Sequence, residues 1–203
     1  YNLCNYYNYT STAYEYDTSS QKNDFSSWTE LSGWTESNPS GATSLPTKSQ
    51  VSEYPATFIR WWGARAYADF YGVKLPSEAQ WEYAAKGGNN YTYAVYDGVT
   101  TSDANWNSSN LTVATHHVRK AKSGNANPYG LYNLGGNVWE WMEDNFVSFS
   151  SASAVDPILY DGSNKRAWRG GSWNYHQATL ESSARYYDEE TKGNDHFGFR
   201  VVR

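Results

Sequence analysis

The sequence has almost no cysteine: Cys4 is the single thiol among 203 residues. One thiol cannot close an internal disulfide, and without a second cysteine no CxxC-type redox or zinc site can form. The four histidines do not supply a metal motif either, because none of them has the spacing of HExxH. We interpret His116 and His117 as exposed loop residues, since neighbours in an extended chain point to opposite faces.

Long apolar runs and long basic runs are absent as well. Because no stretch reaches the roughly 18 apolar residues that a membrane helix needs, we expect no membrane span. The formal net charge is −5 and the densest basic stretch, residues 119–122, is short, so nucleic acid is not an expected partner. Serine-hydrolase elbows and phosphate-binding glycine loops are also missing, which excludes two of the commonest catalytic motifs.

Aromatic residues, by contrast, make up 18% of the chain, with ten tryptophans and nineteen tyrosines. Disordered chains are poor in such residues, so we expect this chain to fold. Its length suits a single domain over residues 1–203, in which residues 1–53 show little periodicity. Aliphatic residues are few, and the core must therefore be built from large rings whose polar atoms need partners.

A first helix is predicted over residues 57–71. Apolar residues recur there every four positions, as on one face of a helix: Phe58, Trp62, Ala66 and Phe70. Trp61 widens that face. Thr57 is placed to cap the N-terminus of this helix, and Gly72 stands where a glycine commonly ends one.

A second helix is predicted to follow from Ser77. This residue and Gln80 have the spacing of a capping box, in which each side chain bonds the main-chain N–H of the other residue. The buried stripe and the end of the helix follow further along the chain: Trp81, Ala84, Ala85 and the glycines at 87–88.

Strands are predicted mainly in the second half of the sequence. Trp139 and Trp141 alternate with a charged residue, which is the period of a strand. Alternation also favours strands over residues 166–173 and 197–203, and over the shorter stretch 91–96. Because helices come early and strands late, the fold class is α+β.

The C-terminal segment has stiff ends and a polar middle. Glycines and aromatic residues frame it at 168–173 and 197–203. Between these frames lie 23 residues, 174–196, of which 13 are Asn, Asp, His, Ser, Thr or Tyr. Tyrosine offers a rigid amphipathic contact surface, and Ser and Asn adapt their hydrogen bonds, as in antibody loops. The pattern indicates a binding surface held on a scaffold, although an ordinary polar loop has the same composition.

Four motifs occur in an order that resembles the formylglycine-generating enzyme (sulfatase-modifying factor) family. They are LPSEAQWEYAAKGG at residues 75–88, YGLYNLGGNVWEW at 129–141, RGGSW at 169–173 and GFR at 198–200. The resemblance extends over about residues 54–203. It implies a C-type-lectin-like fold of the α+β class, with two helices, a small twisted antiparallel sheet and long loops.

The same resemblance argues against catalysis. Catalytic members of the family carry two cysteines, two and seven residues after the aromatic residue of the GGSW-like motif, and the matching positions here hold Tyr175 and Leu180. That oxidase chemistry needs thiolates that bind copper and exchange with the substrate thiol, which a phenol and an isobutyl group cannot replace. We therefore expect no enzyme activity of this kind.

One branch of the family, the variable proteins of diversity-generating retroelements, fits the framed segment better. Their variable region lies at the C-terminus between a GGSW-like start and a GFR-like end, where adenine-directed mutagenesis yields residues such as Asn, Tyr, Asp and His. The resemblance implies a ligand-binding protein, displayed on a bacterial cell surface or a phage particle, whose partner is a protein or another cell-surface molecule. The implied contact residues are Asn174, Tyr175, His176, Tyr186, Tyr187, Asp188, Asn194, Asp195 and His196.

A calcium site is also implied by the resemblance. Family members hold calcium with an Asn side chain, two main-chain carbonyls and a Glu, and the matching positions here are Asn133, Gly136, Val138 and Glu140. Calcium prefers about 6–8 oxygen ligands, so waters or further groups would complete the set. The alternative is that Asn133 caps a turn while Glu140 forms an ion pair. We expect Arg200 to pair with an acidic residue such as Glu140 or Glu143.

Two other functions stay open for the sequence. A cysteine-less paralogue of the formylglycine-generating enzymes would have a structural or accessory role, or altered chemistry. A calcium-dependent carbohydrate-binding module is the other alternative, but the EPN, QPD and WND signatures of sugar-binding C-type lectins do not occur.

Overall fold

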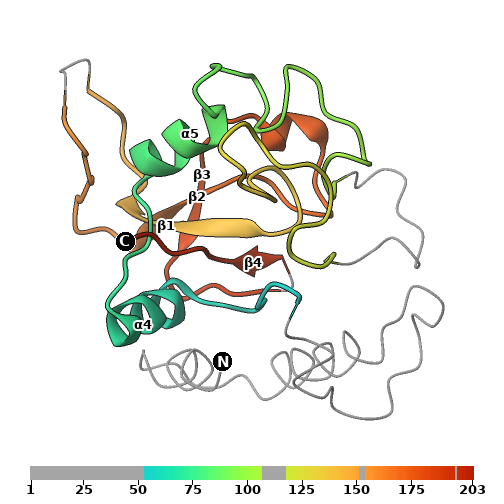
Figure 1. The fold of residues 1–203 in the computed structure, drawn as a ribbon. Coiled ribbons are helices and arrows are strands. Elements are labelled where there is room, and N and C mark those ends of the chain that lie inside the picture. Colours follow the sequence, from blue (N-terminus) through green and yellow to red (C-terminus); the bar gives the residue numbers. More distant parts are fainter. Residues whose placement is uncertain (1–52, 107–117, 151–153, 195) are drawn as a thin grey trace, which may run out of the picture.

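A computed structural model describes residues 53–106, 118–150, 154–194 and 196–203 of the chain (Figure 1). Cys4, His116, His117 and Asp195 lie outside the described residues, as does the weakly patterned N-terminal part. Within the described ranges, the ribbon forms a small sheet with a helix on either side. The architecture is therefore α+β, as the order of the predicted elements indicates.

The sheet has four strands in the order β3-β2-β1-β4. They are β1 (Trp139–Asn145), β2 (Lys165–Arg169), β3 (Tyr186–Glu189) and β4 (Phe197–Gly198). Strand β2 pairs antiparallel with both β1 and β3, but β4 runs parallel to β1. The prediction of an antiparallel sheet is wrong for this edge, because the chain crosses from β3 to the far side of β1 and then runs in the direction of β1.

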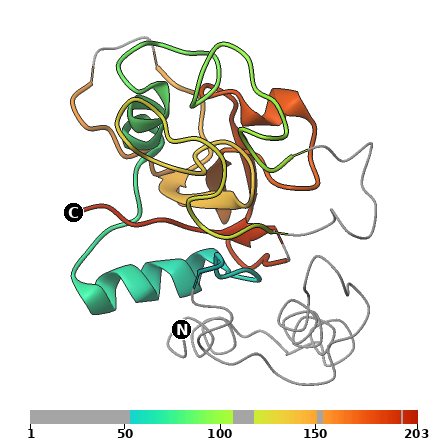
Figure 2. The ribbon, with the colours of Figure 1, turned by 45° about the vertical axis from the view of Figure 1, so that its right-hand side comes forward.

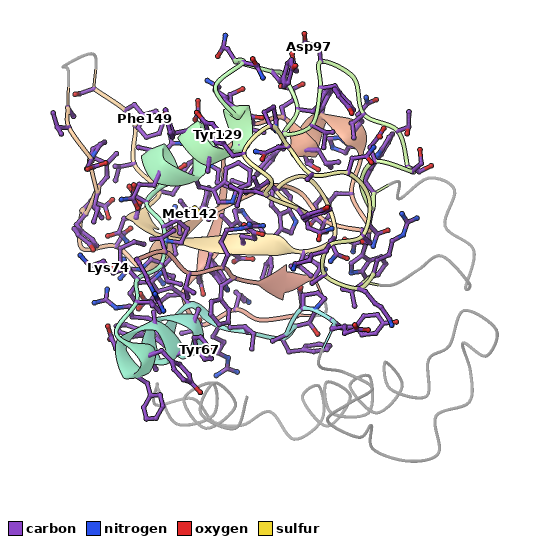
Figure 3. The ribbon with its side chains drawn as sticks, viewed as in Figure 1. Tyr67, Lys74, Asp97, Tyr129, Met142 and Phe149 are labelled. Carbon is purple, nitrogen blue, oxygen red and sulfur yellow. The ribbon has the colours of Figure 1, made fainter. Side chains whose placement is uncertain are left out.

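Helices α4 (Trp61–Tyr71) and α5 (Glu78–Lys86) cover opposite faces of the sheet (Figures 1 and 2). Successive residues of a strand point to opposite faces. Trp139 of β1 accordingly packs in the cluster on the α4 side, whereas Met142 packs with Trp81 of α5 (Figure 3). The core is rich in large rings, as the composition predicts.

The first helix begins later than predicted. It starts at Trp61 because Phe58 has a left-handed backbone, with a φ of 56°, which a right-handed helix cannot contain. Thr57 is therefore not the N-cap. That position belongs to Arg60, whose side chain forms no capping hydrogen bond.

The buried face of α4 agrees with the prediction at Trp61 and differs from it elsewhere. It consists of Trp61, Gly63, Ala64 and Ala68. Trp61 donates its indole N–H to the carbonyl oxygen of Met142 at 2.8 Å, which ties this face to β1. Phe70, predicted to be in the core, is 67% exposed, whereas Trp62 is half-buried and packs against the core cluster that contains Trp61.

The second helix has the predicted capping box. The Ser77 hydroxyl accepts the N–H of Gln80 at 3.2 Å, and the Gln80 side chain accepts the N–H of Ser77 at 3.1 Å. Trp81 and Ala85 are buried, while Ala84 is half-buried. Both helices end as predicted at glycines in the left-handed conformation, Gly72 and Gly87.

The predicted strand at 91–96 does not form. Tyr93 forms only an isolated bridge with Glu181 in this stretch. The carboxylate of Asp97 accepts the N–H of Thr92 at 3.0 Å, so a local side chain closes the stretch into a loop.

The predicted C-terminal strands are shorter than expected. Strand β2 ends at Arg169, because Gly170 and Gly171 turn the chain with φ values of 95° and 73°. Beyond β4, Val202 forms an isolated bridge to Lys74. Strand β3 was not predicted, and it lies inside the polar C-terminal segment.

Asp144 of β1 is a buried carboxylate at the start of α5. Its oxygens accept the N–H groups of Glu78 at 2.9 Å and Leu159 at 3.0 Å. Burial away from water nevertheless raises the pKa of this carboxyl to about 6, and the carboxylate of Glu78 adds to the rise. Folding therefore makes the Asp144 carboxyl bind its proton more tightly than it does in the unfolded chain.

Asp144 is expected to make the domain less stable as the pH rises from about 4 to about 7. A carboxyl with a raised folded-state pKa contributes its stability fully below the unfolded value, 3.8, and loses it as the pH rises through about 6. The shift corresponds to about 2–3 kcal/mol. Urea unfolding of the wild type and Asp144→Asn across this pH range measures the effect. The variant also loses one hydrogen bond, but that offset is constant, so equal pH dependence in both proteins would contradict the assignment.

Candidate ligand-binding surface

The polar C-terminal segment starts at a tight turn after β2. Gly170 and Gly171 adopt positive φ values that residues with a side chain rarely adopt. A Cβ at Gly170 would lie 2.8 Å from the carbonyl oxygen of Leu134, and one at Gly171 would lie 2.7 Å from Cδ1 of Leu180. Gly170 thus lets the chain pass close to the loop before β1, and Gly171 lets it pass close to Leu180 further along the segment.

Trp173 fixes the first residues of the segment to the core. Its side chain is buried and packs in a cluster with Val138. The main-chain N–H of Trp173 donates to the carbonyl oxygen of Asn137 at 3.1 Å. Ser172 is also buried, and its hydroxyl donates to Oδ1 of Asn174 at 2.7 Å. The segment therefore leaves the core from a fixed starting point.

Part of the segment belongs to the core rather than to the surface. Residues Gln177–Leu180 form a 3-10 helix, and Leu180 is buried with Val99 and Ala104. Thr179 is buried as well. The position that matches the second family cysteine is thus structural, and the framed segment is not one continuous exposed loop.

Trp139 of β1 brings together two predicted contact residues that are distant in sequence. Its ring centroid lies 5.3 Å from that of Tyr175, nearly perpendicular, and 5.0 Å from that of Tyr186. Trp168 stacks on Trp139 at 4.9 Å. Trp139 is buried, whereas Tyr175 is half-buried and Tyr186 is exposed. The phenol rings of Tyr175 and Tyr186 therefore pack against the same buried indole ring of Trp139.

His196 supports Tyr175 from the other end of the segment. The two ring centroids are 5.4 Å apart, and Nδ1 of His196 lies 3.4 Å from Nδ2 of Asn174. His196 is only 9% exposed, and its main-chain N–H donates to Oδ1 of Asn194 at 3.2 Å. We therefore expect His196 and Asn194 to hold Tyr175 and Asn174 in place.

Tyr187 lies on the other face of the sheet. Consecutive residues of a strand point to opposite faces, so Tyr187 points away from Tyr186. Its ring centroid is 4.8 Å from that of Phe146, and Nζ of Lys165 lies 4.8 Å from the centre of the Tyr187 ring. The predicted contact residues are thus divided between the two faces of β3.

The remaining predicted contact residues lie around these two groups. His176 is exposed, and its carbonyl oxygen accepts the N–H of Thr179 at 3.0 Å. Asp188 is half-buried, and its carboxylate accepts the N–H of Glu189 at 2.8 Å. Asp195 lies outside the described residues.

Sequence reasoning missed the residues that support the two exposed tyrosines. Trp139, Phe146 and Lys165 come from β1 or its end and from β2, not from the polar segment. The alternation of Trp139 with Glu140 indicated a strand, but it did not indicate which strand would lie beside it. Trp139, Phe146 and Lys165 can support the two tyrosines only because β2 pairs with β3, and the sequence does not reveal this pairing.

Two of the four positions matched to a calcium site, Asn133 and Glu140, have side chains that are engaged in protein contacts. The buried Glu140 carboxylate pairs with Arg200, as predicted, with both its oxygens at 2.6 Å from the guanidinium. The indole N–H of Trp81 donates to the same carboxylate at 2.6 Å, and Oδ1 of Asn133 accepts the N–H of Lys122 at 2.8 Å. In this arrangement the guanidinium supplies the positive charge beside Glu140. The side-chain oxygens therefore do not fit a calcium ion without rearrangement.

Calcium is expected to leave the stability of the domain unchanged. A site that binds calcium only in the folded state would raise the free energy of unfolding by about 2.7 kcal/mol at 100 times its Kd, which shifts Tm by several degrees. Thermal unfolding in excess EDTA, and then in about 1 mM CaCl2, measures this shift. A rise that EDTA reverses would show that calcium binds the folded domain and would contradict this expectation.

Neither a metal-ligand cluster nor a membrane helix occurs in the described ranges. No three or more His, Cys, Asp and Glu side chains gather there in a way that could hold a metal ion. In the same part of the chain, no helix is long and apolar enough to cross a bilayer. The two positions that the resemblance matches to the family cysteines hold a half-buried phenol, Tyr175, and a buried aliphatic side chain, Leu180.

Sequence comparison connects the chain to known domains. The profile of the sulfatase-modifying factor enzyme 1-like domain matches residues 5–203. The serine/threonine-protein kinase pkn1 of Chlamydia caviae is 34% identical over 157 residues, which are 75% of this chain and 24% of that protein. The formylglycine-generating enzyme of Streptomyces coelicolor is 30% identical over 190 residues, which are 86% of this chain and 60% of that enzyme. The chain thus spans about a quarter and about three fifths of the length of these curated relatives.

Structural comparison gives the same fold. Treponema denticola variable protein 1 superposes with a TM-score of 0.65 at 20% identity, over 86% of this chain and 79% of that chain. At this identity the likeness shows the fold alone. Together with the profile match, it confirms the predicted C-type-lectin-like fold of the formylglycine-generating type.

Proposed function

We propose that this chain, which belongs to the family of sulfatase-modifying factor enzyme 1-like domains, is a ligand-binding variable protein of a diversity-generating retroelement. In this proposal the scaffold is constant, and the residues that differ between copies lie between 174 and 196. The likeness of the fold to a protein named as a variable protein supports the proposal.

The observation that carries the proposal is that different residues anchor the segment and form its surface. Trp173, Leu180 and Phe197 are buried and hold the segment to the core, while Tyr186 and Tyr187 are exposed. Exposed side chains can change with little effect on folding, whereas buried ones cannot. A segment built in this way tolerates changes at its contact residues, which a diversified binding surface requires.

The residues at the two family cysteine positions support a binding role. Tyr175 packs on Trp139, and Leu180 is buried. Neither side chain can supply the thiolate that the oxidase chemistry needs. Cys4, the one cysteine of the chain, is far from both positions in the sequence. We therefore propose that the chain lacks the oxidase activity of its enzymatic relatives.

The proposed ligand is a protein or another cell-surface molecule, and the proposed location is a bacterial cell surface or a phage particle. Tyrosine side chains bury much area at a small cost in conformational entropy, which suits the binding of protein surfaces. Tyr186 and Tyr187 offer such area on both faces of β3. The net charge of −5 is unfavourable for a nucleic-acid ligand.

Sequencing of the gene across a growing population tests the proposal. We expect substitutions at adenine positions of codons 174–196, a nearby near-repeat of this stretch, and a neighbouring reverse-transcriptase gene. Absence of both the near-repeat and the reverse-transcriptase gene would refute the retroelement origin.

Replacing Tyr187 by alanine is expected to weaken ligand binding and to change the free energy of unfolding by no more than about 0.5 kcal/mol. The reason is that this ring is 44% exposed and contributes little to the core. Urea unfolding measures stability, and flow cytometry measures binding to bacterial cells that the wild type recognises. Tyr83→Ala, at an exposed position on α5, is the control and should change neither quantity much. A stability loss above about 2 kcal/mol for Tyr187→Ala would place the ring in the core.

A cysteine-less relative of the formylglycine-generating enzymes is the second candidate. The 30% identity with the Streptomyces coelicolor enzyme favours it. Such a protein would keep the scaffold and have a structural or accessory role, or altered chemistry. Copper titration combined with oxygen uptake separates the two candidates, because tight copper binding with turnover would favour the second.

A further inference from the structure

The two edges of the sheet differ in what covers them. Residues 56–59 of the same chain line the outer side of β4: Ile59 N–H donates to the carbonyl oxygen of Phe197 at 3.4 Å, and a Cβ at Gly198 would lie 2.9 Å from the carbonyl oxygen of Ala56. Strand β3 forms the opposite edge, and no other strand of the described ranges pairs with its outer side. An open edge offers main-chain N–H and C=O groups to another strand.

The hydrogen bonds of β2 show which way its main chain faces. The N–H of Phe146 donates to the carbonyl oxygen of Lys165 at 3.0 Å, so the main chain of Lys165 faces β1. Hydrogen-bonding direction alternates along a strand. The main-chain groups of Arg166 and Trp168 therefore face β3.

The same alternation determines which groups of β3 point outward. Asp188 and Tyr186 are the partners of Arg166 and Trp168, so their main-chain groups face β2. The N–H and C=O groups of Tyr187 and the N–H of Glu189 then point away from the sheet. The N–H of Glu189 already donates to the Asp188 carboxylate at 2.8 Å. Tyr187 therefore carries the open pair of main-chain groups.

Two rings lie on either side of this open pair. Tyr186 rests against Trp139 on the α4 side, and Tyr187 rests against Phe146 on the α5 side. Both phenols are exposed. The side chains of an added strand would alternate between the same two faces and would meet one phenol on each.

We infer that the open edge of β3 binds an extended peptide segment of the ligand as an added strand. The inference rests on the proposed binding function and names the part of the ligand that is recognised. The N–H and C=O of Tyr187 form the main-chain hydrogen bonds, while Tyr186 and Tyr187 contact alternate side chains of the segment. Apolar or aromatic side chains at these alternate positions match the two phenol faces.

Main-chain recognition suits a surface whose side chains change between copies. The N–H and C=O groups at position 187 stay in place whichever non-proline residue stands there. The edge therefore contributes an affinity that is common to all variants, and the side chains at 186 and 187 select among peptide sequences.

Proline at position 187 separates main-chain from side-chain recognition. Tyr187→Pro removes the outward N–H without removing a hydrogen bond to β2, and proline is tolerated on an edge strand whose N–H faces solvent. Tyr187→Val is the matched control, because it removes the same ring and keeps the N–H. The probe is a set of linear peptides of about 10 residues, the upper length of common strands, selected on the full wild-type chain from a displayed random library.

The selected peptides are expected to bind Tyr187→Pro about tenfold more weakly than Tyr187→Val, which is the loss expected for one main-chain hydrogen bond. Equal affinities for the two variants would overturn the inference, as would a selection that yields no peptide for the wild type. A wild-type dimer that Tyr187→Pro converts to a monomer would show that a second copy occupies the edge, and would overturn it too.

Hydrogen exchange covers the case in which Tyr187→Pro fails to fold. A saturating selected peptide should slow exchange of the Tyr187 amide in the wild type by at least about tenfold, while the Asp188 amide, which already faces β2, changes little. Unchanged exchange at Tyr187 would overturn the inference. The retroelement proposal is tested separately on the gene, so an invariant gene with protection at Tyr187 would refute that proposal alone.

Discussion

Replacing Arg169 by methionine is expected to lower the free energy of unfolding by about 3–5 kcal/mol. The guanidinium is fully buried, and it donates to the carboxylates of Glu78 at 2.8 Å and Glu82 at 3.1 Å. It also donates to the carbonyl oxygens of Ser182 at 3.1 Å and Ala184 at 3.2 Å. Methionine fills much of the volume but leaves a buried carboxylate with one cation fewer and removes the donor to both carbonyls.

Urea unfolding followed by tryptophan fluorescence measures this loss. Arg119→Met is the control. The guanidinium of Arg119 donates an exposed hydrogen bond to the carbonyl oxygen of Thr101, and its loss should lower the free energy of unfolding by about 0.5 kcal/mol or less. A double variant with Glu78→Gln should lose less than the sum of the two single variants, since the buried charge of Glu78 causes much of the cost. A loss below about 1 kcal/mol for Arg169→Met would contradict this account.

The same arginine explains how β3 is held in place. Ser182 and Ala184, which accept from Arg169, stand just before β3 in the chain. Arg185, the next residue, forms two hydrogen bonds to the Glu78 carboxylate, at 2.8 Å and 2.6 Å. Ion pairs therefore connect α5 to the residues that lead into the open edge. These ion pairs and the pairing of β3 with β2 hold the edge without a contribution from the exposed phenol groups, whose side chains are then free to vary.

Structural features that depend only on residues close together in the sequence could be predicted. The capping box of Ser77 with Gln80 forms as expected, because both hydrogen bonds span three residues. The period of two at Trp139 does mark a strand, since alternation reflects the local backbone. The pairing of Arg200 with Glu140 is one of the two pairings that the sequence led us to expect, the other being with Glu143.

Features that depend on contacts between distant segments could not be predicted. The start of α4 depends on the left-handed turn at Phe58, whose N–H donates to the carbonyl oxygen of Asn194 at 2.8 Å. Strand β3 forms because β2 offers it a hydrogen-bonding partner, although its own residues lack a clear strand period. His196 was read as a surface residue, but it is buried because it packs between Tyr175 and Phe197.

Replacing Trp139 by alanine is expected to cost about 3–5 kcal/mol and to abolish ligand binding together with stability. The side chain is 1% exposed and contacts Trp168, Tyr175 and Tyr186, so its loss leaves a large cavity under the half-buried Tyr175 and the exposed Tyr186. Urea unfolding measures the cost. Exchange broadening of the two tyrosine ring signals in NMR spectra reports whether the phenols lose their fixed positions.

Two phenylalanine variants separate the ring packing of these tryptophans from their hydrogen bonds. The indole N–H of Trp139 is buried without a hydrogen-bond partner among the described residues, so Trp139→Phe should cost less than about 1.5 kcal/mol. The indole of Trp141 donates to the carbonyl oxygen of Ile59 at 2.7 Å, so Trp141→Phe leaves a buried carbonyl unsatisfied and should cost about 1–3 kcal/mol more. Equal losses of stability for Trp139→Ala and Trp139→Phe would mean that an aromatic ring at position 139 does not support Tyr175 and Tyr186.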